Sequence, residues 1–299
     1  MVASTIAPVA LGSSLIAAVF FGAEGVLAKR GIESGGNPLA VSLTVAVVSV
    51  VVFGTGAVVF SEMTILTDHS LVHIAVFLIA GVVGSGFGVL VMYQGVDRVG
   101  ASVNTAVVNS RPLIVAILGV VILSESLDLV TVGGIIILVL GLIFVSLSRG
   151  GDVRGWNPID LLVPFTTAIL FAGGNVMRRY GLTRTDIPLI EGIAVNAFGG
   201  LVILGGYVLL FRRDAISAAS PRSYAWSAGT GCCTASALLS MFFALELERV
   251  AIVDAIIATA PLMSLLLTAM FLRDLEHVTR RITFGVILVV IGTILIVSL

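Results

Sequence analysis

Three ionisable side chains lie inside long apolar segments of the chain. Glu24 is in the first such segment, Arg111 is in the fourth, and Asp254 is near the start of the ninth. A charge at the centre of a membrane-spanning helix costs at least about 2.5 kcal/mol, so we expect each of these side chains to face a cavity or a partner. Carboxylates and an arginine in such places can bind a charged solute or carry a proton.

Polar uncharged side chains occur in the same and in neighbouring segments. With the three charged residues they form the predicted substrate-binding set, which consists of Glu24, Tyr93, Asn104, Asn109, Arg111, Asn175, Asn196 and Asp254. Asparagines also form hydrogen bonds between packed helices, so a single amide is weak evidence for a site. Their occurrence together on several helices favours a shared site.

Each charged residue also has a simpler alternative role. Glu24 precedes Lys29 by five residues and could pair with a cation at the membrane interface. Arg111 could be a structural cation that Glu24 or Asp254 neutralises, because buried charges usually find partners. Asp254 could stabilise the amino end of its helix through the helix dipole.

Two prolines lie within apolar segments at corresponding positions of the chain's two halves. They are Pro112 in the fourth segment and Pro261 in the ninth. A proline removes a backbone donor and tends to kink its helix, which frees a carbonyl on the preceding turn. We therefore expect kinks at both prolines and, beside Arg111, a polar and irregular spot at mid-membrane. The alternative is a packing kink without a ligand.

Motifs for enzyme chemistry are absent from the sequence. His69, His73 and His277 are scattered near predicted loops, and Cys232 and Cys233 are adjacent. Vicinal cysteines rarely form an unstrained disulfide, so we interpret them as small packing residues. The sequence predicts no enzyme activity, no metal and no cofactor. The net charge of −1 does not indicate nucleic-acid binding.

The elements that must position these residues are membrane helices. Hydrophobic residues make up 58% of the chain and charged residues 11%, with a mean hydropathy of +1.18. Soluble domains carry roughly 25% charged residues. Runs of about 20 apolar residues match the thickness of the hydrocarbon core as helices, whereas a barrel strand needs only about 10. The predicted helices are Leu11–Ala28, Pro38–Phe60, Leu71–Tyr93, Ala101–Leu123, Leu129–Leu147, Ile159–Met177, Pro188–Phe211, Tyr224–Leu245, Ala251–Leu272 and Ile282–Ser298.

The second five helices repeat the first five about 150 residues later. Matched residues include Pro38 with Pro188, Gly31 with Gly181, Arg98 with Arg249, Pro112 with Pro261, Glu125 with Asp274, Gly134 with Gly285, and Gly141 with Gly292. Each half has an odd number of spans, so the halves enter the membrane in opposite orientations. The predicted fold is an all-α integral membrane protein with ten transmembrane helices in two inverted five-helix repeats. The predicted repeats are residues 1–148 and 159–299, joined by a linker at 149–158.

Several motifs resemble those of the EamA-type transporters in the drug/metabolite transporter superfamily. The first is Gly22-Ala23-Glu24-Gly25-Val26-Leu27-Ala28-Lys29, which resembles the family's first-helix segment. The second runs from Arg98 through Pro112-Leu113 to Leu123-Ser124-Glu125-Ser126-Leu127 and resembles a stretch that ends in the family's LGE-L pattern. The second half repeats it from Arg249 to Leu275. Glu24 and Arg111 depart from the residues that many relatives carry at these places.

The resemblance implies a secondary transporter with a central cavity lined by helices 1, 3, 4, 6, 8 and 9. We therefore predict a multi-pass protein of the cell membrane that moves a small metabolite, amino acid-like or another organic solute, by alternating access, as an exporter. Its partners are then the substrate and the lipid bilayer. Protons are a candidate coupling ion, with Glu24 as the residue that is charged in one conformation and protonated in the other. The alternative is a membrane-embedded binding or scaffold protein of the same fold without net transport.

The cations of the connections between helices predict an orientation. The connections 1–2, 3–4, 5–6, 7–8 and 9–10 carry Lys29, Arg30, Arg98, Arg149, Arg154, Arg212, Arg213, Arg222, Arg273, Arg280 and Arg281, whereas the other side carries Arg178, Arg179, Arg184 and Arg249. The positive-inside rule places the richer side in the cytoplasm and both termini outside. The family resemblance implies the opposite arrangement, with the termini inside.

Overall fold

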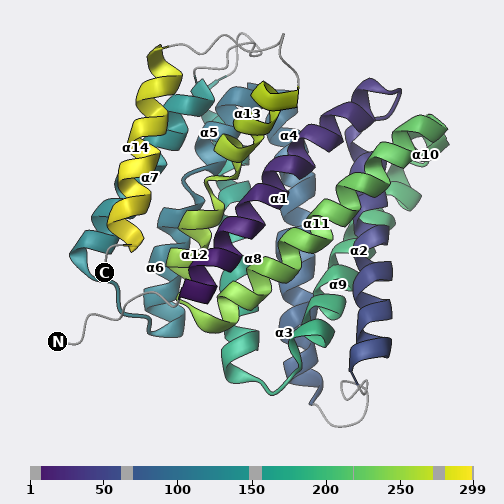
Figure 1. Cartoon of the computed structure of the whole chain (residues 1–299). Helices are drawn as coiled ribbons and strands as arrows, with labels where there is room; N and C mark the ends of the chain where they lie inside the picture. Colours follow the sequence, from purple (N-terminus) through teal and green to yellow (C-terminus); the bar gives the residue numbers. More distant parts are fainter. Residues whose placement is uncertain (1–7, 62–69, 148–156, 218, 272–279, 298–299) are drawn as a thin grey trace.

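The computed structural model describes residues 8–61, 70–147, 157–217, 219–271 and 280–297. Within these residues, every regular element is a helix (Figure 1). The first half of the chain contains α1 (Pro8–Glu33), α2 (Pro38–Phe60), α3 (Leu71–Ala80), η2 (Gly81–Gly88), α4 (Val89–Val99), α5 (Ala101–Val108), α6 (Arg111–Leu123) and α7 (Leu129–Leu147). The second half contains η3 (Pro158–Leu161), α8 (Leu162–Arg184), α9 (Leu189–Phe211), α10 (Asp214–Ser217), α11 (Pro221–Leu247), α12 (Val250–Ile257), α13 (Ala260–Phe271) and α14 (Arg280–Val297).

These helices form the predicted membrane spans. Nine helical segments of the described chain are long and apolar enough to cross a membrane, and the shorter apolar helix Phe284–Val297 within α14 supplies the tenth. Three spans are composite: α3, η2 and α4 form the third, α5 and α6 the fourth, and α12 and α13 the ninth. The segments alternate in direction, so the two ends of the described chain lie at the same edge of the bundle (Figure 1).

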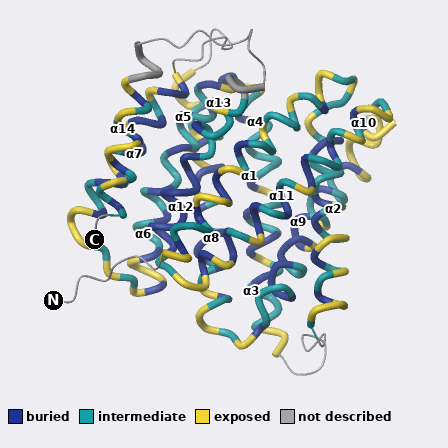
Figure 2. Tube along the Cα trace, in the orientation of Figure 1, coloured by how far each residue is buried: buried dark blue, intermediate teal, exposed yellow. Residues whose placement is uncertain are grey.

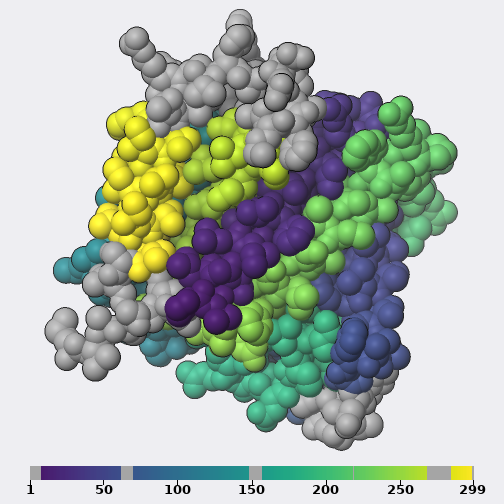
Figure 3. Space-filling model, viewed as in Figure 1, coloured from purple at the N-terminus to yellow at the C-terminus, as the bar shows by residue number. Residues whose placement is uncertain are grey.

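The exterior of the bundle is apolar, as a lipid-facing surface must be. Exposed large hydrophobic side chains occur along the spans, for example Val51 on α2, Ile117 on α6 and Leu210 on α9. In Figure 2 the inward faces of the central helices are buried, and the exposed positions follow the outer faces and helix ends. On the face that Figure 3 shows, α1 lies between α11 and the helices α13 and α14.

Contacts between α7 and α14 show the relation between the two repeats directly. A β-carbon built at Gly141 would lie 2.7 Å from the carbonyl oxygen of Gly285, and one built at Gly134 would lie 2.9 Å from that of Gly292. The sequence repeat pairs Gly134 with Gly285 and Gly141 with Gly292. Exchanging each residue for its repeat partner therefore turns one contact into the other. This is the behaviour of a pseudo-two-fold axis that passes between the two helices.

Gly141→Ala should destabilise the protein because the added β-carbon requires α7 and α14 to separate. Overpacking of this kind costs about 1–3 kcal/mol. The matched control is Gly133→Ala on the same helix, since a β-carbon there meets nothing within 4 Å. Thermal unfolding in detergent measures both variants. Equal melting temperatures for the two variants would contradict the tight contact.

Several helices extend beyond their predicted ends. The helices Pro38–Phe60 and Leu129–Leu147 match the prediction, whereas α1 continues to Glu33, α4 to Val99 and α8 to Arg184. Tyr93 therefore lies within a helix and does not close it. Polar residues near the interface can continue a helix past the hydrocarbon, and hydropathy does not detect them. The predicted ends Leu272 and Ser298, and most of the linker 149–158, lie outside the described residues.

The longer α8 reduces the number of cations in the even-numbered connections. Arg178 was predicted to lie in a connection, but it is buried within α8. Without Arg178, the odd-numbered connections exceed the even-numbered ones in cations by a larger number. We therefore keep the prediction that these connections are cytoplasmic and the termini external. A cysteine introduced at Ser298 should react with an impermeant thiol reagent added from outside, with Cys232 and Cys233 replaced by serine. Labelling from the cytoplasmic side alone would reverse the orientation.

Candidate substrate site between the repeats

Two repeat-related membrane spans are interrupted part-way along their length. The first break separates α5 from α6 at Asn109 and Ser110, and the second separates α12 from α13 at Ala258 and Thr259. Pro112 and Pro261 lie in the first turn of the helix that follows each break, where a proline needs no backbone donor. The backbone N–H of Leu113 bonds to the Ser110 carbonyl at 3.0 Å, and that of Leu262 to the Thr259 carbonyl at 2.8 Å. At both breaks the backbone hydrogen bond therefore spans three residues, where a regular α-helix has four.

The two broken helices meet at an ion pair. Nε of Arg111, on α6, donates to Oδ2 of Asp254, on α12, at 3.0 Å. Asp254 is 1% exposed, whereas the Arg111 side chain is 21% exposed. Of the alternatives for these residues, the structure shows the pairing of Arg111 with Asp254. It does not place Asp254 in the first turn of its helix, because α12 begins at Val250.

Hydrogen bonds extend this pair into a buried network. Nδ2 of Asn175 donates to Oδ1 of Asp254 at 2.6 Å, and Oδ1 of Asn175 accepts from Nη1 of Arg178 at 2.6 Å. Nε of Arg178 donates to Oδ1 of Asn196 at 3.0 Å. The network thus connects the two broken helices to α8 and α9. We call Arg111, Asn175, Arg178, Asn196 and Asp254 the cationic network.

A π-helical segment brings the third span into the same network. Glycines of η2 allow close approach of neighbouring helices, since a β-carbon at Gly84 would lie 3.1 Å from Nη2 of Arg178 and 3.3 Å from Cα of Gly174. Ser85 of η2 accepts from Nη2 of Arg178 at 2.9 Å. π-helical turns often occur at functional sites.

Glu24 lies in a second, separate cluster. Its carboxylate interacts with the side chain of Thr234 on α11 and acts electrostatically on Tyr93 and Cys233. Tyr93 in turn forms a hydrogen bond with Ser42 on α2. The alternative pairing of Glu24 with Lys29 is not seen, because Lys29 lies beside Glu33. Of the two carboxylates that could neutralise Arg111, Asp254 forms the pair, and no ion pair between Glu24 and Arg111 occurs within the described structure.

A pocket of about 280 Å³ lies at the odd-numbered connections and reaches Tyr93. Its lining comes from the start of α2, from α4 and from the end of α9, and comprises Asn37, Pro38, Leu39, Leu90, Tyr93, Gln94, Val96, Asp97, Tyr207 and Arg212. Tyr93 thus lines this pocket, bonds to Ser42 and lies within electrostatic reach of Glu24.

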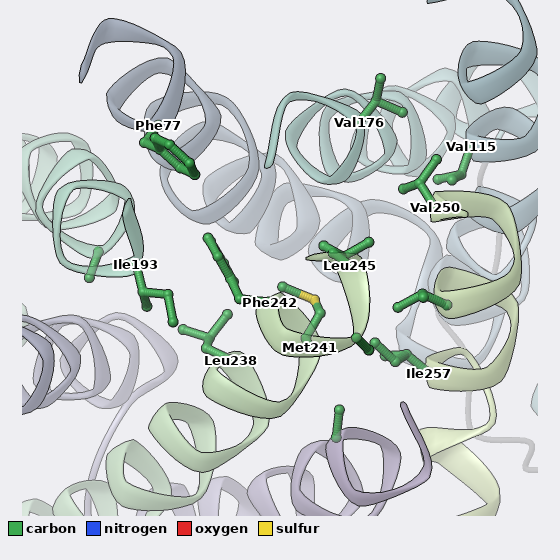
Figure 4. Packing of buried hydrophobic residues seen from close by; sticks show 14 of the residues in the cluster. Phe77, Val115, Val176, Ile193, Leu238, Met241, Phe242, Leu245, Val250 and Ile257 are labelled. Carbon is green, nitrogen blue, oxygen red and sulfur yellow. The ribbon is translucent and has the colours of Figure 1, made fainter. Parts of the chain in front are cut away.

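Polar contacts around Glu125 hold helices together at the opposite end of the bundle. The Glu125 carboxylate accepts from the backbone N–H of Val250 at 3.1 Å and pairs with Nε of Arg179 at 3.4 Å. Arg179 also donates to the Leu245 carbonyl. These contacts join the segment that follows α6 to α8, α11 and α12. Beside them lies a buried apolar cluster that includes Phe77, Val115, Phe242, Leu245 and Val250 (Figure 4).

The structure does not bring all predicted site residues together. Asn104 is buried against Gly95, and its Oδ1 accepts no hydrogen bond within the described residues. Nδ2 of Asn109 donates to Oγ of Ser146 on α7 at 3.1 Å. Within the described structure neither amide bonds to a residue of the two clusters, and Asn109 makes the interhelical bond that was its alternative role.

Four residues of these clusters were missed from the sequence. They are Ser42, Ser85, Arg178 and Thr234. Serine and threonine are common in membrane helices, so no sequence signal distinguished them. Arg178 could have been found by continuing the eighth helix past Met177, because Arg178 lies three residues after Asn175 and so on the same face.

An inverted pair of five-helix repeats, with broken helices and polar residues at mid-membrane, is an architecture of membrane transporters. The model of the EamA-like transporter family matches the chain twice, over residues 9–147 and 158–298. The chain therefore belongs to the EamA-like transporter family and is a multi-pass membrane protein.

Solved structures share the fold. One crystal structure, described only as that of a protein, matches with a TM-score of 0.80, covering 96% of this chain and 97% of its own, at 13% sequence identity. Such low identity shows the fold alone. No curated protein sequence matches the chain.

Proposed function

We propose that the protein is a secondary transporter that exports a small organic metabolite by alternating access. The observation that supports this most is the Arg111–Asp254 pair, because it links the broken helix of one repeat to that of the other. Substrate sites of inverted-repeat transporters lie at this interface. The helix contacts around Glu125 at one end and the pocket at the other fit a protein that opens to one side at a time.

Flux through purified protein tests this proposal. A ligand that raises the melting temperature of the detergent-solubilised protein is radiolabelled and offered to proteoliposomes. Unlabelled ligand trapped inside should accelerate uptake of the label by exchange. Asp254→Asn should abolish the exchange, whereas Arg98→Gln, which removes an exposed ion pair with Asp160, should retain it. Binding without exchange would instead indicate a membrane-embedded binding protein.

A further inference from the structure

The cationic network carries more positive than negative charge. Arg111 and Arg178 each bring one cation, and Arg178 lies close enough to Arg111 and Asp254 to experience both charges. Within the described residues, Asp254 is the carboxylate of this network. Arg178 is 6% exposed, and its hydrogen-bond partners are two asparagines and a serine, all uncharged. A surplus cation in a low-dielectric interior is strongly unfavourable without a further anion.

The same region also has more hydrogen-bond donors than acceptors. Asn196 is fully buried, and its Oδ1 accepts from Arg178, which fixes its Nδ2 as the remaining donor. That Nδ2 has no acceptor among the described residues. Arg111 uses Nε for Asp254, and neither of its terminal nitrogens bonds to a described residue. A guanidinium presents its remaining N–H groups in a fork that matches a carboxylate or a phosphate.

We propose that the cationic network binds the anionic group, a carboxylate or a phosphate, of a small organic substrate. Arg111 makes the direct contact with the substrate anion because it is the more exposed of the two arginines. Arg178 is buried, and its positive charge attracts the anion without direct contact. Asp254 leaves the network with one uncompensated cation, which suits a group carrying one negative charge. The inference deepens the proposed function by naming the class of substrate that this site accepts.

A built-in carboxylate tests the charge surplus without any knowledge of the substrate. Asn196→Asp is isosteric, places an anion at Nε of Arg178 and removes the unpartnered amide donor. It should raise the melting temperature of the ligand-free protein by about 3 °C or more. The matched control is Asn104→Asp, an isosteric change at another buried asparagine with no arginine contact in the described structure. It should lower the melting temperature. A decrease for Asn196→Asp equal to that for Asn104→Asp would overturn the proposal.

Ligand binding tests the anion itself. The probes are matched pairs: an amino acid and its amide, a dicarboxylate and its diamide, and a phosphate monoester and its parent alcohol. The charged member of at least one pair should stabilise the wild-type protein, and the pair that responds distinguishes carboxylate from phosphate. Arg111→Gln should weaken that binding at least tenfold and Asn196→Asp should abolish it, whereas Arg98→Gln should not change it. Equal stabilisation by charged and neutral members, or by neither, would refute the inference.

The flux experiment separates this inference from the proposed function. Exchange of a solute whose binding is independent of its charge would overturn the anion site but would still support the transport function. Anion binding that depends on Arg111, without exchange across the membrane, would support the site and overturn the transport function.

Discussion

Glu24→Gln should leave the protein able to exchange its substrate across a membrane but unable to accumulate it in response to a proton gradient. The carboxylate interacts with Thr234, Tyr93 and Cys233, and no cation is bonded to it within the described structure. A carboxylate in such surroundings can gain a proton in one conformation and lose it in another. Glutamine keeps the size of the side chain and cannot change its charge, so exchange continues while the proton no longer contributes.

The measurement compares counterflow with uptake driven by an imposed pH gradient in the same proteoliposomes. Glu33→Gln is the matched control, because Glu33 ends the same helix with a half-exposed side chain beside Lys29 and Arg30. It should behave as the wild type does in both assays. If uptake by Glu24→Gln is still driven by the pH gradient, another residue couples transport to protons, and Asp254 is the next carboxylate to test.

Removal of Asp254 should destabilise the protein more than removal of Arg111. Breaking a buried ion pair costs about 3–5 kcal/mol, because one charge remains without a partner. The two partners are not equivalent here. Without Arg111, the Asp254 carboxylate still accepts from Asn175 and lies near Arg178. Without Asp254, two arginines remain close together without the carboxylate that both share.

A double-mutant cycle of Arg111→Leu and Asp254→Leu, measured by unfolding in detergent, checks this order. The double variant should recover part of the stability lost by Asp254→Leu, because it removes one of the two cations left unpaired. Arg111→Lys keeps the charge but loses the planar fork, so it should fold normally and bind an anionic substrate weakly. Wild-type transport by Arg111→Ala would exclude both a structural and a substrate-binding role for this arginine.

The sequence predicted the helices and repeats well because long apolar runs leave few alternatives in a membrane. The same reasoning located Arg111 and Asp254, since charges inside such runs are rare and need partners. It also anticipated the breaks before Pro112 and Pro261, because proline acts on its own backbone. These signals are local, and each can be assigned from the residues of one helix.

Partner choice could not be predicted, because it depends on how helices rotate against one another. Glu24 and Asp254 were both possible partners of Arg111, and the structure pairs Asp254 with it while Glu24 interacts with residues of α11 and α4. Asn109 was expected in the site, but it donates to Ser146 on α7. Arg178 was assigned to a connection, because the predicted helix ended at Met177. Its burial depends on glycines of η2, and their packing partners on α8 and α9 are far away in the sequence.

One asymmetry between the halves has a mechanical consequence. The eight residues Gly81–Gly88 form a π-helix, whereas the corresponding part of α11 continues as a regular α-helix. If each repeat adopts in the opposite-facing state the shape that its counterpart has here, Gly81–Gly88 must rewind into α-helix while α11 takes up the wider turns. Rewinding changes the number of residues per turn, so α4 revolves about its own axis relative to α3. The rotation of α4 would then move Tyr93 away from Ser42 as the transporter changes from one facing state to the other.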